Sequence, residues 1–395
     1  MSALLSLAEA QARLLELAPR MGTESVPVEE ALGRVLASKL KAQRTQPPAD
    51  LSAMDGYAIA GDGPWMVVGE SRAGKPFDGM IVEGEATRIS TGAWMPDGAQ
   101  SVLIQENAEV NGATLALAQG ETLPEAGRHV RRAGFDFGMG DKVLSARKLI
   151  GPAQIALALA AGHATLPVSK RPRVAVLDSG DELAANPAEC GPDQIPASNG
   201  AMLAAMLAPL VGKVERLGPV ADDMGALAAA LERAEDCDIL VTSGGASVGD
   251  HDLVQSALRD WDAELAFWKV AIKPGKPLMV ARRGKTVVLG LPGNPVSSFV
   301  TGFLFAMPLV RLSLGMGECF PRARTAIAAG AMPAVGSRHE FIRGQLQEHS
   351  AAPLASKDSS ALRELALANC LIDRPPHSPA IEAGDEIRVY PLENG

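Results

Sequence analysis

The chain of 395 residues lacks the features that mark secreted, nucleic-acid-binding or disulfide-rich proteins. Its four cysteines form no C-x-x-C pair, which argues against a disulfide framework or a structural zinc site and favours a reducing compartment. The formal net charge of −9 disfavours a nucleic-acid partner, because such proteins need a basic face. Aromatic residues make up only 4% of the chain, so alanine, leucine and valine must supply most of the core.

Long hydrophobic runs are also missing. The longest, 153–161, stops at Gly162 and is too short to cross a bilayer. The first ten residues lack a basic region, so they do not read as a signal peptide. We therefore expect a cytoplasmic protein with no membrane partner. The length itself predicts two to four domains.

The pattern along the chain indicates how those domains are arranged. Helical periodicity is expected over 6–17, 28–40 and 150–161, whereas 65–143 is rich in glycine and carries the hairpin signal Asn111-Gly112. The predicted units are a discontinuous helical domain (1–45 plus 145–170), a β-rich insertion (46–144), an α/β domain (171–317) and a C-terminal β domain (318–395).

The α/β domain is predicted from alternating strands and helices. Such alternation is typical of a doubly wound parallel sheet, whose ligands bind beyond the carboxyl ends of the strands. The predicted strands are 174–177, 213–217, 239–241 and 287–289, with helices over 201–210 and 225–234.

Three glycine-rich breaks then fall within 242–298: Thr242–Asp252, Lys273–Pro277 and Gly290–Ser298. The first and third each follow a strand and lead into a helix, so backbone N–H groups and the helix dipole favour an anion there. Asn294 is placed to cap the last helix, and an ordinary strand-to-helix turn is the less favoured alternative for the third segment. The first segment lacks the G-K-[ST] of a Walker loop. Together they predict a phosphate-bearing ligand.

Charged side chains accompany these breaks. The alternating segment 267–273 predicts one strand with Lys269 and Lys273 on the same face, and Lys276 follows in the next turn. Asp250 and Asp252 would repel a phosphate unless a divalent cation such as Mg²⁺ lay between them. Capping of a helix by either aspartate remains the alternative.

In their order along the chain, these segments resemble the molybdopterin molybdenumtransferase family, which includes the MoeA proteins and the E domain of gephyrin. The matching segments cover nearly the whole chain. They are Ser52–Ala58, Ile89–Ala93, Arg132–Asp136, Ser179–Leu183, Ile195–Asn199, Ser243–Gly249, Phe267–Pro277 and Gly290–Pro295.

The resemblance implies a multidomain α/β plus β fold: a doubly wound molybdopterin-binding domain, a discontinuous helical domain, a β insertion and a C-terminal β-barrel. It also implies an elongated homodimer whose site combines the parallel-sheet domain with the other subunit's insertion. The implied reaction converts adenylylated molybdopterin and molybdate, with Mg²⁺, to molybdenum cofactor and AMP. Molybdopterin adenylyltransferase and cofactor-accepting enzymes are further candidate partners.

Roles carried over from the resemblance fall into three groups. The implied catalytic residues are Asp55, Thr91, Glu182, Asp252, Lys269 and Lys273. The implied substrate- and phosphate-binding residues are Ser243, Gly244, Gly245, Ser247, Lys276, Gly290, Pro292, Gly293, Asn294, Ser297 and Ser298. The implied metal ligands are Glu182, Asp222 or Asp223, Asp250 and Asp252.

The chain departs from the family pattern in its last domain. Arg363 and Glu364 stand where the family often has paired serines, whereas Arg343 fits the pattern. Two other functions compete with the transferase. Molybdopterin adenylyltransferase shares the α/β domain, but the Ser52–Ala58 segment and the insertion favour the molybdenum-inserting enzyme. A non-catalytic scaffold like gephyrin is disfavoured by the intact aspartates and lysines.

Overall fold

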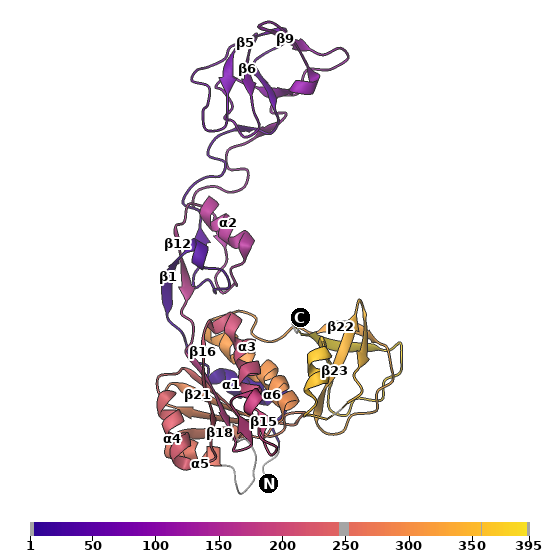
Figure 1. Ribbon diagram of the computed structural model, residues 1–395. Coiled ribbons are helices and arrows are strands. Elements are labelled where there is room, and N and C mark those ends of the chain that lie inside the picture. The colour runs from indigo at the N-terminus through magenta and orange to yellow at the C-terminus, as the bar shows by residue number, and fades with distance from the viewer. Residues whose placement is uncertain (1–3, 245–252, 357, 393–395) are drawn as a thin grey trace.

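The protein, described here by a computed structural model, is elongated and built from several units (Figure 1). The described residues are 4–244, 253–356 and 358–392. The β insertion lies at one end, a small middle module follows, and the α/β domain lies at the other end with the C-terminal barrel beside it. The predicted multidomain fold, a parallel-sheet domain together with β units, is confirmed.

The β insertion is a curled six-stranded sheet in the order β7-β4-β6-β5-β9-β8. The predicted hairpin is present, and Gly112 turns between its strands at φ +63°. A small core forms around Trp65, Ile59, Leu103 and Leu115. The strands are β4 (Gly56–Ile59), β5 (Trp65–Ser71), β6 (Glu85–Ile89), β7 (Ser101–Ile104), β8 (Ala108–Asn111) and β9 (Thr114–Leu117), with the short pair β3 (Leu51–Ser52) and β10 (Val130–Arg131) beside them.

The middle module is discontinuous in sequence, as the resemblance implied. Its two antiparallel pairs each join an early and a late segment, and helix α2 packs with them. The elements are β1 (Thr23–Pro27) with β12 (Thr165–Ser169), β2 (Leu40–Lys41) with β11 (Lys142–Leu144), and α2 (Pro152–Ala160).

The prediction of a second helix over 28–40 is wrong. Only a single 3₁₀ turn, Val28–Glu30, forms before Gly33 takes a left-handed conformation at φ +70°. Leu36 then pairs with Val168 instead of continuing a helix. The apolar residues that suggested the helix pack against α2 and β12, so tertiary contacts override the local periodicity.

The first helix, α1 (Leu7–Glu16), has the predicted capping box between Ser6 and Glu9. Its buried residues Ala10 and Leu14, however, belong to the core of the α/β domain and not to the middle module. The N-terminal segment therefore begins on the α/β domain and then leads away to the middle module (Figure 1).

The α/β domain contains a six-stranded sheet in the order β16-β13-β17-β21-β20-β18. The first four strands are parallel and correspond to the four that the sequence predicts. They are β16 (Val214–Val220), β13 (Val174–Ser179), β17 (Ile239–Ser243) and β21 (Thr286–Leu291), followed by antiparallel β20 (Met279–Arg283) and β18 (Glu264–Trp268).

Helices cover both faces of this sheet, which is the doubly wound arrangement. One apolar cluster lies under α1, α3, α6 and α7, and a second lies under α4 and α5. The helices are α3 (Asn199–Val211), α4 (Met224–Arg233), α5 (Leu253–Asp260), α6 (Pro295–Thr301) and α7 (Met307–Ser313), with the short parallel pair β14 (Leu183–Ala184) and β15 (Ile195–Pro196) near the sheet edge.

One helix within the described ranges is long and apolar enough to cross a membrane by composition alone. It runs over Pro295–Ser313, through α6, a π-helical segment and α7, and 78% of it is buried inside the protein. That burial makes it a core helix of the α/β domain. All four cysteines are free thiols, as the sequence predicted.

The C-terminal domain is a closed five-stranded barrel, because β23 pairs with both β24 and β25. The strand β19 (Ile272–Lys273) lies in the segment that leaves the α/β domain, and it pairs in parallel with the start of β23. The barrel elements are β22 (Arg324–Ala328), β23 (His339–Gln347), β24 (Ser350–Pro353), α8 (Leu362–Leu367), β25 (Cys370–Arg374) and β26 (Glu386–Pro391).

Candidate active site

Two of the predicted glycine turns meet at the carboxyl edge of the parallel sheet. Strands β17 and β21 pair in register there, with Ser243 opposite Leu291. The N–H of Gly244 donates to the carbonyl of Leu291 at 3.1 Å, and Gly244 has a φ of +99° that favours glycine. Gly293 lies beside it, because a Cβ added to Gly293 would be 3.7 Å from the Gly244 Cα. Backbone groups of both turns therefore face the same region.

The helix after the third break begins as predicted, with Asn294 at the N-cap and Pro295 in its first turn. The Asn294 side chain makes no capping bond, and the Val296 N–H donates to the Ser359 carbonyl of the C-terminal domain at 2.9 Å. Ser297 and Ser298 are buried. This helix end consequently offers a ligand fewer donors than the sequence suggested, and the glycine turn carries more of the predicted anion binding.

An asparagine that sequence reasoning gave no role supports this turn. Asn199 begins α3 and donates from its side-chain Nδ2 to the Gly293 carbonyl at 2.7 Å. The bond ties the start of one helix to the glycine turn before another. The segment Ile195–Asn199 matched the family pattern, and that match was the signal that could have marked this residue.

Asp178 is a second buried support, at the end of β13 and only 3% exposed. Its carboxylate fills the space beside Gly200, where an added Cβ would be 2.0 Å from Oδ2. Burial raises the pKa of the Asp178 carboxyl, and Arg216, 3.8 Å away, partly opposes that shift. A glycine at position 200 is therefore required for the aspartate to reach the start of α3.

The predicted acidic group is only partly assembled by the described residues. The N–H of Asp222 donates to Asp181 Oδ1 at 3.0 Å, which ties the turn after β16 to the loop after β13. Burial raises the pKa of Asp222, and the negative charges of Asp181 and Glu182 raise it further. Asp223 instead caps α4 by accepting from the Ala226 N–H at 2.9 Å. The structure thus separates two aspartates that the sequence left as alternatives.

Carboxylate oxygens of this kind are the ligands that Mg²⁺ prefers, and a cation would relieve the repulsion around Asp222. Within the described ranges, no three histidine, cysteine, aspartate or glutamate residues gather closely enough to hold a metal ion. Four predicted site residues lie outside the described residues, and two of them are predicted metal ligands. They are Gly245, Ser247, Asp250 and Asp252.

The prediction of one continuous strand over 267–273 is wrong. Strand β18 ends at Trp268, Lys269 takes a positive φ of +65°, and β19 then begins in a different sheet. The Lys269 ammonium lies 4.1 Å from the centre of the Trp268 ring, a cation–π contact. Lys269 and Lys273 therefore do not share one strand face, because the chain passes between two domains at this point.

Lys273 and Lys276 lie on the turn that follows. Gly275 in this turn has a φ of +104°, and an added Cβ would be 2.5 Å from Thr301 Cγ2. This close approach holds the lysine turn against the last residue of α6, while Lys273 and Val296 of the first turn of α6 line one pocket. Lys273 Nζ meanwhile lies 2.9 Å from Glu340 Oε1 of the barrel.

Arg343 and Glu364 hold a barrel loop at the same junction. The buried Arg343 guanidinium donates to the carbonyls of Ser356, Asp358 and Ala361 at 2.6–2.9 Å. Burial lowers the pKa of Arg343, with Glu364 and Asp358 opposing the shift. Both Glu364 carboxylate oxygens accept from the Ser356 N–H. The departure from the family pattern at Glu364 therefore provides an anchor for this loop.

Asp55 and Thr91, predicted on the insertion side, lie together. Asp55 Oδ1 accepts from the Thr91 N–H at 2.7 Å and from its hydroxyl at 3.1 Å. Both residues are exposed. Gly56 allows β4 to approach β7 closely, because an added Cβ would be 2.1 Å from the Leu103 carbonyl oxygen.

The insertion and the α/β domain stand at opposite ends of the molecule, with the middle module between them (Figure 1). Asp55 and Thr91 of one chain are consequently remote from the glycine turns of the same chain. Within one chain, Asp55 and Thr91 form one half of the predicted site, and the glycine turns with the lysines form the other. The described residues do not bring these two halves together.

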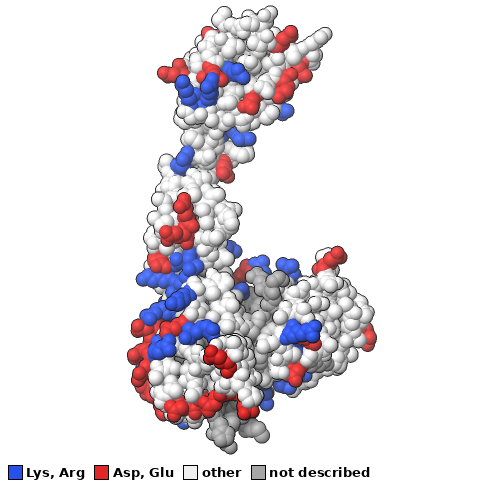
Figure 2. Space-filling view, viewed as in Figure 1, with Lys and Arg blue, Asp and Glu red and all other residues white. Residues whose placement is uncertain are grey.

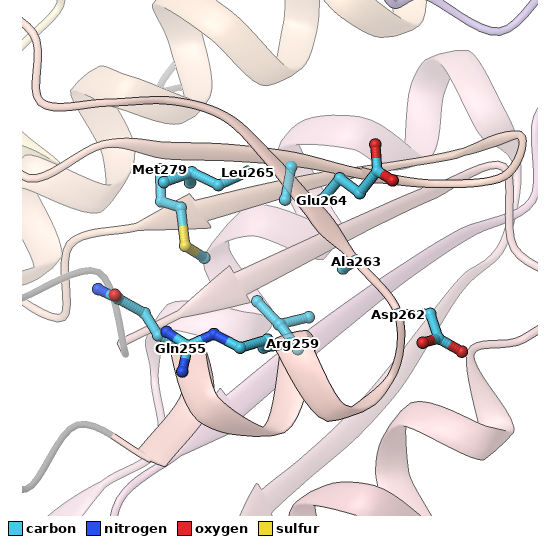
Figure 3. Close-up of a pocket in the computed structure, with 9 residues that line it drawn as sticks. Gln255, Arg259, Asp262, Ala263, Glu264, Leu265 and Met279 are labelled. Atoms are coloured by element: carbon cyan, nitrogen blue, oxygen red, sulfur yellow. The ribbon is translucent and has the colours of Figure 1, made fainter.

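A separate hollow of about 480 Å³ lies between α5 and the strands β18 and β20 (Figure 3). Gln255 and Arg259 reach into it from the helix, and Met279 reaches in from the sheet. None of the predicted site residues that the structure describes is part of its lining. Acidic side chains dominate the surface around α4 and α5, whereas basic side chains gather where the middle module meets the α/β domain (Figure 2).

Family models of known proteins match the domains of this chain in their order along the sequence. Three family models match in order: the MoeA N-terminal region (domain I and II) over 5–162, a probable molybdopterin binding domain over 175–311, and the MoeA C-terminal region (domain IV) over 325–392. Molybdopterin molybdenumtransferase 2 of Mycobacterium tuberculosis is 34% identical over 387 residues, covering 93% of this chain and 95% of that protein.

The chain belongs to the molybdopterin molybdenumtransferase family. Another member, the molybdopterin molybdenumtransferase of Haemophilus influenzae, is 31% identical and covers 99% of both chains. The crystal structure of the molybdopterin biosynthesis moeA protein from Pyrococcus horikoshii superposes with a TM-score of 0.84 at 27% identity, covering 99% of this chain and 100% of that one. Likeness over the full length includes the insertion and barrel, so it extends beyond the shared α/β domain.

Proposed function

We propose that this protein inserts molybdenum from molybdate into adenylylated molybdopterin, with Mg²⁺-dependent release of AMP, as a cytoplasmic homodimer. Molybdenum cofactor biosynthesis follows from the family to which the chain belongs. The observation that carries the detailed proposal is the meeting of the Gly244 and Gly293 turns at one sheet edge. Lys273 lines a pocket together with Val296, in the helix that follows the Gly293 turn.

The site residues divide the work by chemistry. The glycine turns suit the phosphate oxygens of an adenylylated pterin, since Gly244 and Gly293 let a ligand approach the backbone without the bulk of side chains. Lys273 and Lys276 add mobile positive charge for molybdate and phosphate. Asn199 holds the Gly293 carbonyl, which keeps the turn in its binding conformation.

Glu182 and Asp222, together with Asp250 and Asp252, are the residues that would hold Mg²⁺. The bound cation would act as a Lewis acid on the phosphoanhydride that joins pterin phosphate to AMP. Asp223 is less suited to this role, because its carboxylate already caps α4. The chain's own part is to position the anhydride between the glycine turns and the lysines.

The separation of the two predicted half-sites supports the proposed homodimer. Asp55 and Thr91 of one chain cannot contact the glycine turns of that chain in this elongated structure (Figure 1). A second subunit placed with its insertion against the α/β domain would complete the site twice, once for each chain. Exchange of pterin with molybdopterin adenylyltransferase and with cofactor-accepting enzymes is proposed on the same functional grounds.

The test is incubation of the purified protein with adenylylated molybdopterin, Mg²⁺ and molybdate, with AMP measured by chromatography. We expect AMP release that requires both molybdate and Mg²⁺. The Asp55→Ala and Lys273→Ala variants should lose it, and full release by both would overturn the residue assignment. Absence of release from the native protein would overturn the function, while transfer of AMP from ATP to molybdopterin, with release of pyrophosphate, would identify an adenylyltransferase.

A further inference from the structure

Lys273 already has a carboxylate partner in the free protein. Its Nζ lies 2.9 Å from Glu340 Oε1, in a pocket that Arg343 also lines. The two residues stand opposite each other where β19 of the α/β domain pairs with β23 of the barrel. An oxyanion that binds Lys273 must therefore compete with a carboxylate from the neighbouring domain.

Glu340 also has a second cation within reach. On its other side, β23 pairs with β25, and Glu340 stands directly opposite Arg374. Residues paired in this way point to the same face of a sheet. Arg374 is 1% exposed, and its Nε and Nη1 have no hydrogen-bond partner among the described residues. Its Nη2 is engaged with the carbonyls of Pro333 and Pro379.

We propose that Glu340 is an internal counterion that neutralises Lys273 in the empty site and turns toward Arg374 when an oxyanion takes its place. This inference rests on the proposed function, in which Lys273 binds molybdate. Glu340 is then a positioning residue: it keeps the lysine over the pocket, and it sets how tightly a competing anion is held.

The partial exposure of the Lys273–Glu340 pair, compared with the burial of Arg374, allows Glu340 to exchange one cation for the other. The Lys273 side chain is 46% exposed and that of Glu340 is 24% exposed, so their ion pair is partly solvated and weak. Arg374 is a buried cation whose charge is otherwise matched only by carbonyl dipoles, so a carboxylate that approaches it is stabilised. A doubly charged oxyanion would also interact with Lys273 more strongly than a single carboxylate does.

The experiment measures binding of molybdate and of tungstate to the full-length protein by calorimetry, together with the molybdate dependence of AMP release. Glu340→Gln removes the competing charge at nearly constant size. We expect it to lower the Kd for either oxyanion by about two- to fivefold, the range of a partly exposed ion pair. The KM for molybdate should fall by the same factor, while kcat changes little.

The matched control is Glu235→Gln, which removes a carboxylate paired with Arg283 at 3.3 Å on the α/β domain. Its Kd should equal that of the native protein. Glu340→Asp, which keeps the charge but shortens the reach to Lys273, should give an intermediate Kd. It also keeps the comparison measurable if Glu340→Gln folds poorly.

Unchanged or weaker oxyanion binding by folded Glu340→Gln would overturn the proposal. A simple structural role would lower the melting temperature without tightening binding, and that outcome would also overturn it. If both proteins bind oxyanion with the expected difference but neither releases AMP, the counterion role stands and the proposed function fails.

Discussion

The α/β domain and the β insertion build their halves of the site in different ways. In the α/β domain, backbone turns at the ends of β17 and β21 are clamped by bonds such as Gly244 to Leu291, with apolar clusters on both sheet faces. In the insertion, the exposed Asp55 carboxylate is held by Thr91, and the domain has only a small core around Trp65. The first half is suited to binding an extended anion, and the second to contributing a single polar group.

The comparison also underlies the proposed need for two chains. Each half is ordered by its own core, and the middle module holds the two halves apart (Figure 1). Changes in one half should therefore leave the folding of the other half intact. Function should instead depend on both halves at once, through contact between subunits.

The largest expected effect comes from mixing subunits. Asp55→Ala and Lys273→Ala proteins should each lose AMP release by about 100-fold or more, since each lacks one half of every site. Random reassembly of the two variants should restore about a quarter of native activity, because half of the dimers then contain one intact site.

A suitable control mixes Asp55→Ala chains with chains that carry both substitutions. These dimers contain no intact site and should remain inactive. If the first mixture also stays inactive while dimers exchange subunits, the halves do not meet between chains.

A smaller but still large effect is expected from Gly56→Ala in the insertion. The added Cβ would meet the Leu103 carbonyl oxygen at 2.1 Å, so β4 and β7 must separate. We expect a loss of about 3 kcal/mol in the stability of the insertion alone. Differential scanning calorimetry should show an early transition, with the α/β transition unmoved.

Gly317→Ala is the matched control, since an added Cβ there has nothing within 4 Å among the described residues. It should melt like the native protein. Native-like melting of Gly56→Ala would show that the two strands are less tightly packed than described.

Asn199→Ala should weaken the other half of the site. It removes the 2.7 Å bond to the Gly293 carbonyl, and a bond of this kind contributes about 1 kcal/mol. The KM for molybdate-dependent AMP release should rise about fivefold. Asn369→Ala removes two side-chain bonds to the Leu346 backbone inside the barrel, at 2.9 and 2.6 Å, and should change stability without changing that KM.

The smallest expected effect is a change in pH dependence at Asp178. Burial raises the pKa of this carboxyl in the folded protein above the ordinary 3.8, although Arg216 and the Gly200 N–H oppose the shift. The folded state therefore holds the proton more tightly than the unfolded state does. The stabilisation that comes from the protonated Asp178 carboxyl is present below pH 3.8 and is lost as the pH rises through the folded-state pKa.

Asp178→Asn does not titrate, so its stability relative to the native protein should increase over that rise in pH. Urea unfolding at a series of acidic to neutral pH values measures the difference. Parallel curves for the two proteins would show that Asp178 has an ordinary pKa.

Much of the architecture could be predicted because the signals were local. Three of the four parallel strands of the α/β domain are short apolar runs that lead to a glycine, whereas β16 also carries Glu215 and Arg216; all four were found. The capping box at Ser6 and the Asn111-Gly112 hairpin are also local devices. The helix over 28–40 failed because its apolar spacing was satisfied by contacts with α2 and β12, which lie more than 100 residues away in the sequence.

The sequence by itself determined the fold family, the glycine turns and which charged residues accompany them, since each depends on neighbours along the chain. Only the tertiary structure decided which of those charges are available. It paired Lys273 with Glu340 from another domain and brought the Asp181 carboxylate to the backbone N–H of Asp222. The physical reason is that a side chain's partner depends on which distant segments pack beside it, and local periodicity carries no record of that packing.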